Sequence, residues 1–288
     1  VFELQLRTYA AFPHRSSHIV AGAKPRAVAH RMLRPRKLLH LFALIFLLPL
    51  MLHAVWWLAH SPDVDWHSAD WSSAGILPSA STSPEASVHI YCAPTGRWKG
   101  VFAVHSWIVV KEAGARRYTR FDVVGWGRPV KVDGWPPDAR WFGNEPQLVA
   151  AVTGPQAARL VPQLRAAVAH YSHGRAGDYR IWPGPNSNTF VAEILAQIPQ
   201  AGIVLPANAI GKDFRGAGLY AGLSPSRTGL QMSALGLFGL TVGWVEGIEV
   251  NVLSLVAGLD WRHGAVKLPG WGTVRLNDVL AAAARAGS

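Results

Sequence analysis

The sequence predicts an α+β fold, in which an antiparallel sheet packs against helices, placed after one N-terminal transmembrane helix. Three observations favour it: an apolar run near the start of the chain, strand patterns joined by short loops, and helix patterns that do not alternate regularly with strands. Half of the 288 residues are hydrophobic, which excludes a disordered or collagen-like chain. The single cysteine, Cys92, excludes an internal disulfide framework and a cysteine-rich metal site.

The basic charge is concentrated in residues 1–37. This segment carries +7 of the formal net charge of +11, from eight basic residues against the single acidic residue Glu3. A domain that binds nucleic acid keeps its positive charge in the folded part, so we expect no nucleic-acid partner. Residues 1–37 are predicted to form a basic cytoplasmic tail. Residues 1–31, ahead of Met32, show no clear period and can be an over-extended reading frame.

The apolar run over residues 38–59 would span about 30 Å as a helix, which is enough to cross a bilayer. Arg36 and Lys37 precede it, while Trp56 and Trp57 suit a membrane interface. The positive-inside rule therefore predicts a single-pass protein of the bacterial inner membrane, with a cytoplasmic N-terminus and a periplasmic domain. A cleaved signal peptide is the alternative, but the run is longer than a usual signal core and no small-residue cleavage site follows it.

Residues 60–87 are rich in Ser, Pro, Asp and Trp and are predicted to be a linker. We expect residues 88–288 to form one extracytoplasmic globular domain. Strands rich in β-branched and aromatic residues are expected in its first part, at 88–92, 101–111 and 118–126. A hairpin loop that contains Gly114 would join the last two strands.

The later segments predict further strands and helices. Residues 147–152 fit either a short strand or a helical turn, and a hairpin is expected over 239–255. Helices are expected over 154–170, 186–198 and 276–285. The apolar stretch 235–245 is too short for a second span and predicts a buried pair of strands.

The segment WPGPNSNTF, residues 182–190, is the strongest candidate for chemistry. A rigid Pro-Gly-Pro approach delivers Asn186, Ser187, Asn188 and Thr189 to the expected start of a helix. Free backbone N–H groups and the helix dipole favour negative charge there, so a nucleophile and an oxyanion would both be stabilised. The alternative is that these residues are only good helix caps.

His105 is the second candidate, because it lies in the middle of an apolar strand. If the hairpin is centred between Gly114 and Ala115, Trp107 pairs with Asp122. Asp122 then lies on the same face as His105, one diagonal step and roughly 7 to 8 Å away between backbones. A carboxylate at this position can orient an imidazole, whereas a slip of one residue would turn Asp122 to the other face.

Other residues rank lower. Cys92 ends a strand and fits a small buried apolar position. His170 and His173 have a metal-compatible spacing but lie at a helix end without a nearby carboxylate. Lys212 and Asp213 fit either a cleft or an exposed loop. The sequence therefore predicts no metal site and no cofactor.

The strings WPGPNSNTF, AVHSWIVVK, VVGWG, LPANAIGKDF and EGIEVNVLSL resemble an uncharacterised bacterial family, the domain of unknown function 3750. Asn188, Thr189 and Phe190 match its NTF signature. The resemblance covers the chain from roughly Trp66 to its end. It implies membership of that family but no activity.

The order of the motifs is also similar to circularly permuted papain-like proteins of the NlpC/P60 and lecithin-retinol-acyltransferase type. In those proteins a strand with a histidine precedes a helix that opens with Asn-Cys-x-x-Phe. Here His105 comes first, and Ser187 stands where that cysteine would be. The resemblance implies either a serine nucleophile with His105 as its base and Asp122 as the orienting group, or a site that has lost its chemistry and only binds.

Two functions follow as expectations. The first is an amide or ester hydrolase or acyltransferase of the cell envelope, acting on peptidoglycan peptide or lipid. Its catalytic residues would be Ser187, His105 and Asp122, and its substrate-binding residues Asn186, Asn188 and Thr189. The second is a non-catalytic envelope domain that binds a ligand or partner in the same cleft. In both, the membrane bilayer is an expected partner.

Overall fold

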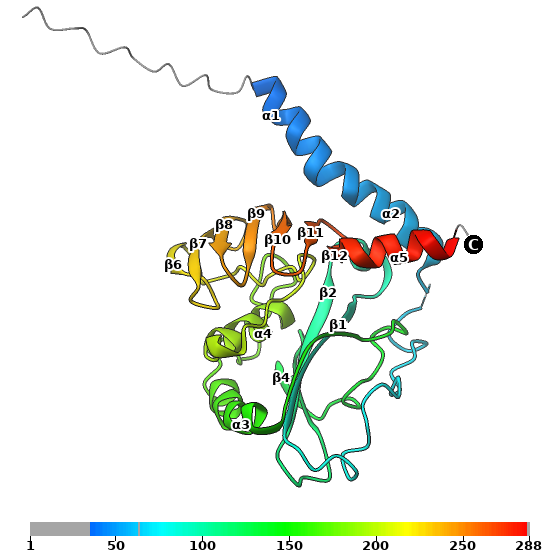
Figure 1. The fold of residues 1–288 in the computed structure, drawn as a ribbon, viewed down its shortest axis with the longest axis vertical. Coiled ribbons are helices and arrows are strands. Elements are labelled where there is room, and N and C mark those ends of the chain that lie inside the picture. Colours follow the sequence, from blue (N-terminus) through cyan, green and yellow to red (C-terminus); the bar gives the residue numbers. More distant parts are fainter. Residues whose placement is uncertain (1–34, 63, 287–288) are drawn as a thin grey trace, which may run out of the picture.

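The computed structural model describes residues 35–62 and 64–286, with side chains described as far as Ala281. Two antiparallel sheets and a few helices form the α+β fold that the sequence predicts, after one long N-terminal helix (Figure 1). The predicted basic tail falls outside the described residues up to residue 34, as does the suggested over-extended segment 1–31.

The N-terminal helix consists of α1 (Pro35–Phe42), a π-helical turn η1 (Ala43–Leu47) and α2 (Leu48–His60). The π-helical turn precedes Pro49, which has no N–H to donate to the regular helical pattern. The whole helix has 26 residues with a mean hydropathy of 2.3 in its apolar part. It is long and apolar enough to cross a membrane, as the sequence predicts.

A five-stranded sheet has the order β4-β3-β2-β1-β5. Its strands are β1 (Ser87–Pro94), β2 (Val104–Lys111), β3 (Thr119–Val123), β4 (Val130–Val132) and β5 (Gln147–Thr153). A 3₁₀ turn η2 (Arg97–Val101) replaces the start of the strand expected from residue 101. The segment left open between strand and helical turn is strand β5, because it pairs with β1 along its length.

The predicted register of the hairpin β2–β3 is confirmed. Val109 lies opposite Arg120 and Val110 lies opposite Thr119, as expected for a turn centred between Gly114 and Ala115. Gly114 adopts a positive φ of 72°, which a glycine accepts without strain. Asp122 therefore shares a sheet face with Trp107 and His105.

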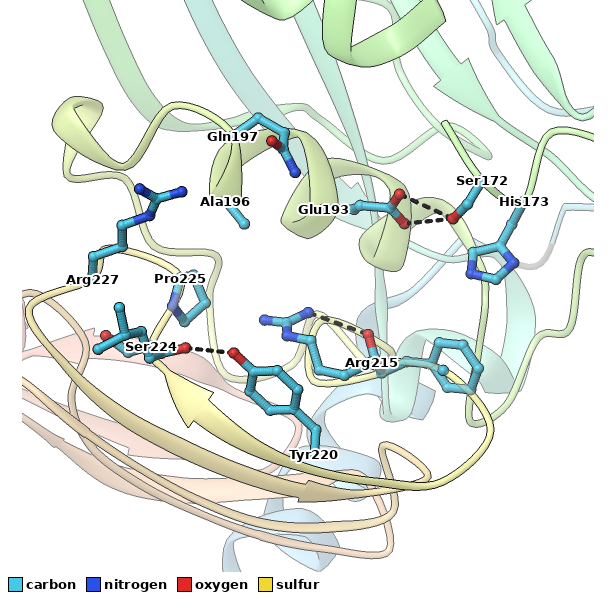
Figure 2. A pocket seen from close by; sticks show the side chains of 13 residues that line it. Ser172, His173, Glu193, Ala196, Gln197, Arg215, Tyr220, Ser224, Pro225 and Arg227 are labelled. Atoms are coloured by element: carbon cyan, nitrogen blue, oxygen red, sulfur yellow. Dashed lines mark hydrogen bonds between the residues drawn. The ribbon is translucent and has the colours of Figure 1, made fainter. Parts of the chain in front are cut away.

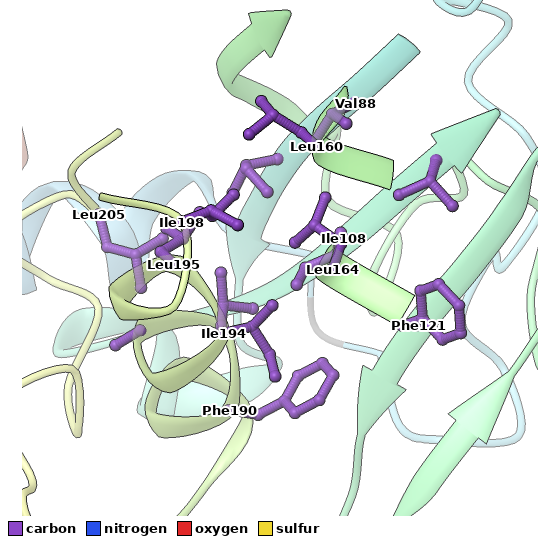
Figure 3. Packing of buried hydrophobic residues seen from close by; sticks show 14 of the residues in the cluster. Val88, Ile108, Phe121, Leu160, Leu164, Phe190, Ile194, Leu195, Ile198 and Leu205 are labelled. Atoms are coloured by element: carbon purple, nitrogen blue, oxygen red, sulfur yellow. The ribbon is translucent and has the colours of Figure 1, made fainter. Parts of the chain in front are cut away.

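One face of this sheet is covered by helices α3 (Gly154–Ala169) and α4 (Ser187–Ala196), which confirm two of the predicted helices. A short 3₁₀ turn η3 (Pro199–Ala201) follows α4. Ile108 of β2, Leu164 of α3 and Phe190 of α4 are fully buried in the core between these layers (Figure 3). This packing fixes the start of α4 against β2.

The segment expected as a linker packs along the opposite face of the sheet. The buried Asp138 carboxylate accepts hydrogen bonds from Ser73 Oγ at 2.5 Å and from the Ile76 N–H at 2.8 Å. Trp71 packs edge-on against Trp141, with ring centroids 5.1 Å apart. Residues 71–77 therefore form part of the wall behind β2, a long-range arrangement that their polar composition does not reveal.

The second sheet is a meander in which strands follow one another in chain order, from β6 to β12. Its strands are β6 (Leu219–Leu223), β7 (Gly229–Ala234), β8 (Phe238–Gly243), β9 (Gly247–Val252), β10 (Leu255–Asp260), β11 (Ala265–Leu268) and β12 (Gly272–Arg275). Helix α5 (Leu276–Ala286) follows it. The predicted hairpin over 239–255 is the β8–β9 pair.

The expected burial of residues 235–245 is wrong. Phe238, Leu240 and Val242 of β8 are exposed by 49%, 41% and 41%. The opposite face of the same strand buries Thr241 instead. Pattern alone gives the alternation of a strand, whereas the face that is buried depends on what the rest of the chain packs beneath it.

Candidate active site

A cavity of about 390 Å³ lies at the end of the five-stranded sheet where β2 begins and β3 ends. His105 of β2 and Ser187 of α4 both line it, although 82 positions separate them in the chain. Its wall also contains aromatic side chains and Lys99. The aromatic residues are Trp126, Trp141, Phe142 and Tyr179. The structure thus brings together the two stretches that the sequence singled out.

Asp122 forms a hydrogen bond with the His105 side chain. Its Oδ1 lies 2.9 Å from His105 Nε2, and both side chains are buried. Arg120 grips the same carboxylate with two hydrogen bonds, from Nε at 2.7 Å and from Nη2 at 2.9 Å. Burial raises the pKa of Asp122, but the Arg120 charge and the hydrogen bonds from His105 and Arg120 outweigh it and lower that pKa overall. Asp122 is therefore ionised at neutral pH.

This pairing sets the state of the imidazole. Burial lowers the pKa of His105, and the Asp122 hydrogen bond and charge offset only part of that effect, so the ring is neutral at pH 7. Because an ionised carboxylate only accepts, Nε2 carries the proton. Within residues 35–62 and 64–286, the other nitrogen, Nδ1, makes no hydrogen bond and keeps its lone pair. Trp141 stacks on the ring at 3.7 Å between centroids and fixes its plane.

Ser187 is the first residue of α4. The preceding Asn186 caps the helix, because its side-chain oxygen accepts from the N–H groups of Asn188 at 3.0 Å and Thr189 at 3.1 Å. The N–H of Ser187 itself donates no hydrogen bond within the described part of the chain. It therefore lies at the positive end of the helix dipole, beside its own hydroxyl.

Tyr179 is the neighbour of the Ser187 hydroxyl. Burial raises the pKa of Tyr179 to about 12, and the nearby Ser187 side chain partly opposes this. The phenol therefore stays protonated and can donate. Gly125 makes room for the ring, since a Cβ there would lie 2.9 Å from Tyr179 Cδ1.

Asn188 connects α4 to β2. Its Nδ2 donates to the backbone oxygens of Val104 at 2.9 Å and Ile210 at 2.8 Å, and its Oδ1 accepts from Ser106 Oγ at 2.7 Å. This amide consequently uses its hydrogen-bonding groups inside the protein. Its expected role in substrate binding stays a prediction, and the geometry gives it a positioning role for Ser187 relative to His105.

Asn186 and Thr189 are engaged in the same way. The Asn186 Nδ2 donates to the backbone oxygens of Ile181 and Ile210, both at 3.0 Å, and the Thr189 hydroxyl donates to Gly211 O at 2.7 Å. Both side chains tie the helix start to the loop at residues 210–211. Their expected contact with substrate also stays a prediction.

Three residues of this site were not singled out from the sequence: Arg120, Trp141 and Tyr179. Arg120 could have been found, because it lies two positions before Asp122 and therefore on the same strand face. Trp141 and Tyr179 come from loops, and no local pattern predicts that they reach the cavity.

A second polar cluster lies beneath the seven-stranded sheet. Lys212 and Lys267 both bind the carboxylate of Glu249, Lys267 through Nζ at 2.5 Å from Oε1. Lys212 and Asp213, which the sequence left open between a cleft and a loop, are buried here. In residues 35–62 and 64–286, no group of three or more His, Cys, Asp or Glu side chains is placed to hold a metal ion.

A larger cavity, of about 570 Å³, lies between α4 and the β6–β7 region (Figure 2). Glu193 accepts a hydrogen bond there from Ser172 Oγ at 3.0 Å, and Arg215 and Arg227 face the same space. Ser172 lies on an exposed loop rather than at a helix start. Of these two cavities, only the smaller one joins a carboxylate-held histidine to a hydroxyl at a helix N-terminus.

Residues 85–214 match the family model described as "Protein of unknown function (DUF3750)". The chain therefore contains a DUF3750 domain over these residues. The matched DUF3750 segment contains β1 to β5, α3, α4 and all six predicted site residues, and it ends before β6. This matched segment is shorter than the expected one, which began near residue 66 and continued to the end of the chain. No curated protein and no solved structure matches the chain.

Proposed function

We propose that this DUF3750 protein is a membrane-anchored amide or ester hydrolase or acyltransferase, with Ser187 as nucleophile, His105 as base and Asp122 as the residue that orients the base. One observation carries the proposal: a neutral histidine held by an ionised aspartate lines the same cavity as a serine at a helix start. These are the parts that activate a hydroxyl for attack on a carbonyl.

The proposed reaction uses the free nitrogen of His105. Nδ1 takes the proton from Ser187 Oγ as the oxygen attacks the carbonyl carbon, and the carbonyl oxygen becomes an oxyanion. The Ser187 N–H and the Tyr179 hydroxyl are suited to donate to that oxyanion. His105 then gives its proton to the leaving amine or alcohol, and a water or an acceptor hydroxyl or amine releases the acyl group from Ser187.

The chain order supports the same proposal. A strand with the base precedes a helix with the nucleophile, as in the permuted papain-like proteins that the sequence resembles. A serine hydroxyl is far less acidic than a thiol, and the complete Asp122–His105 pair suits that need. The likeness to that fold stays a prediction.

The membrane anchor gives the proposed setting. The helix Pro35–His60 is apolar enough to cross a bilayer, and Arg36 and Lys37 lie at its start. We place the N-terminus in the cytoplasm and the domain on the periplasmic side of a bacterial inner membrane. Peptidoglycan peptide and lipid are the acyl substrates within reach of an enzyme tethered there.

A second candidate is a non-catalytic domain that binds a ligand in the same cavity. It is favoured by the low exposure of Ser187 and His105, each only 3% exposed. A ligand could fill the aromatic cavity without touching a reactive oxygen. Labelling of the serine distinguishes the two.

We expect a fluorophosphonate probe to label the full-length protein on Ser187, as mapped by peptide mass spectrometry. Ser187→Ala should abolish the label, and His105→Ala should slow it by about 10²–10⁴-fold, because the base is lost. The labelling rate should rise with pH through a midpoint below 6.5, since burial lowers the pKa of His105 from that value.

The matched control is Ser172→Ala, which changes an exposed serine outside the cavity and should keep the full label. A wild-type protein that is folded by circular dichroism yet takes up no label on Ser187 would contradict the enzyme and favour the binding domain.

A further inference from the structure

The seven-stranded sheet has its apolar face turned outward. Side chains from four neighbouring strands share this face, and all are exposed: Leu219, Leu223, Leu230, Met232, Phe238, Leu240, Val242 and Val250. The face turned toward the rest of the domain is polar and buried instead. It carries Gln231, Ser233, Thr241, Glu249 and Asn251. An antiparallel sheet in water normally shows the opposite arrangement.

Ion pairs and hydrogen bonds hold the inward polar face to the rest of the domain. Glu249 binds Lys212 and Lys267, and Asp213 accepts from Gln231 Nε2 at 3.1 Å and from Asn251 Nδ2 at 3.0 Å. These bonds fix which side of the sheet faces the domain. The outward apolar face therefore cannot turn in, and its size marks a surface that meets an apolar partner.

The N-terminal helix borders this face. Its turn η1 packs against β10, and Phe46 of that turn is buried although most of the helix is exposed. Trp271, in the β11–β12 turn, donates from Nε1 to Pro49 O at 2.9 Å. Figure 1 shows the helix leaving the domain beside β10, β11 and β12. The helix and the sheet thus form one continuous apolar surface.

The position of these helix–domain contacts along the membrane-crossing helix indicates what the apolar sheet face meets. About 20 helical residues are needed to cross a hydrocarbon core of about 30 Å, which here corresponds to residues 38–59. Phe46, Pro49, His53 and Trp57 fall inside that range, and all four contact the globular domain or are buried against it. Parts of the domain that pack on the helix at these positions must lie at the same depth.

The turns at one end of the sheet suit a membrane interface. Trp244 in the β8–β9 turn and Trp261 in the β10–β11 turn are exposed, and Trp261 Nε1 donates to Trp244 O at 3.1 Å. Arg227 and Arg262, in turns at the same end, are exposed as well. Tryptophan and arginine at the border of an apolar surface are typical of residues at the level of lipid headgroups.

We infer that the outer face of the seven-stranded sheet lies against the acyl chains of the same bilayer that anchors the N-terminal helix. The inference rests on the membrane anchor of the proposed function and is independent of the chemistry at Ser187. The protein would then be held to the membrane by a sheet surface as well as by a helix, with the domain pressed against the bilayer rather than tethered at a distance from it.

Spin labels on single cysteines test this in the full-length protein reconstituted into phospholipid nanodiscs. Met232→Cys reports on the sheet face, and Val132→Cys on β4 is its matched control, since the native side chains are exposed by 59% and 57%. Leu44→Cys reports on the helix. The native Cys92 stays silent, because it is buried and burial raises its pKa to about 12.

The measurement compares collisions of each label with oxygen, which dissolves in lipid, and with a water-soluble nickel chelate. We expect labels at Met232 and Leu44 to prefer oxygen several-fold more than the label at Val132 does. Nickel access at Met232 equal to that at Val132, with Leu44 still in lipid, would overturn the inference and leave the anchor. Nickel access at all three positions would overturn the inference and the membrane anchor as well. Spin–spin broadening at Met232 would show a second copy covering the face and would also overturn the inference.

Discussion

Asp122→Ala is expected to slow fluorophosphonate labelling of Ser187 by about 10²–10⁴-fold and to lower the free energy of unfolding by about 3–5 kcal/mol. The loss of stability comes from Arg120, whose fully buried guanidinium would lose the carboxylate that accepts two of its hydrogen bonds. The slower labelling comes from His105, whose Nε2 would no longer be held. Denaturant unfolding and labelling kinetics on the same samples measure the two effects.

Asp122→Asn tests the orienting role of the carboxylate in a side chain of the same shape. The side chain keeps its shape, but an amide nitrogen facing Nε2 would donate to it and move the imidazole proton to Nδ1, which removes the base. We expect labelling to fall by about 10²–10⁴-fold in a protein that still folds. Glu112→Gln, in an exposed ion pair with Arg165, is the control and should change neither property. Labelling of folded Asp122→Asn at the wild-type rate would exclude Asp122 from the site.

Glu249→Ala is expected to lower the free energy of unfolding by about 3–5 kcal/mol without a direct effect on the cavity at Ser187. The substitution leaves Lys212 and Lys267 buried under the sheet without their shared carboxylate. Lys267 is almost fully buried, so its ammonium group is poorly solvated without the carboxylate. Denaturant midpoints of purified protein in detergent measure the change, and Glu145→Ala, in an exposed pair with Arg140, is the control.

A double variant tests the cause. Glu249→Leu combined with Lys267→Met removes one charge of each sign, while Lys212 keeps its ion pair with Asp213 at 3.3 Å, so much of the lost stability should return. A double variant no more stable than Glu249→Ala would show that the cluster acts through packing rather than through charge.

The pH dependence of stability follows from the same cluster. Burial raises the pKa of Glu249, but Lys212 and Lys267 outweigh it and lower that pKa below its ordinary value of 4.5. A lowered carboxylate pKa contributes stability that is fully present above the ordinary value and is lost as pH falls through the folded value. Wild-type protein should therefore lose stability below about pH 4, and Glu249→Gln should lose less over the same range.

The candidate site could be predicted from the sequence where local geometry decides it. The loop at Gly114 fixes the register of β2 and β3, and the register places Asp122 on the face of His105. The capping role of Asn186 follows from the Pro-Gly-Pro approach and the helix pattern behind it. These relations extend over fewer than twenty residues, so the chain near each group determines them.

Long-range contacts decided the rest. The sequence suggested that the Asn188 amide is free to bind a substrate. In the fold, both of its N–H groups donate to backbone oxygens, those of Val104 and Ile210. Trp141 stacks on His105 from a loop 36 residues away. The outward position of the apolar face of the second sheet could not be predicted either, because alternation of apolar and polar residues along a strand does not say which side is buried. The Lys212–Glu249–Lys267 cluster and the hydrogen bonds of Asp213 settle that side.

The pairing of Ser187 with His105 is tested most directly by the acidity of a thiol placed at the helix start. Ser187→Cys adds one reactive thiol to a chain whose native Cys92 is buried and has a pKa raised to about 12. The rate of alkylation by iodoacetamide against pH gives the pKa of the new thiol. The helix dipole and His105 should bring it well below the usual value of about 8.5, and adding His105→Ala should raise it again. A pKa at or above about 8.5, unchanged by His105→Ala, would show that the two side chains do not act together.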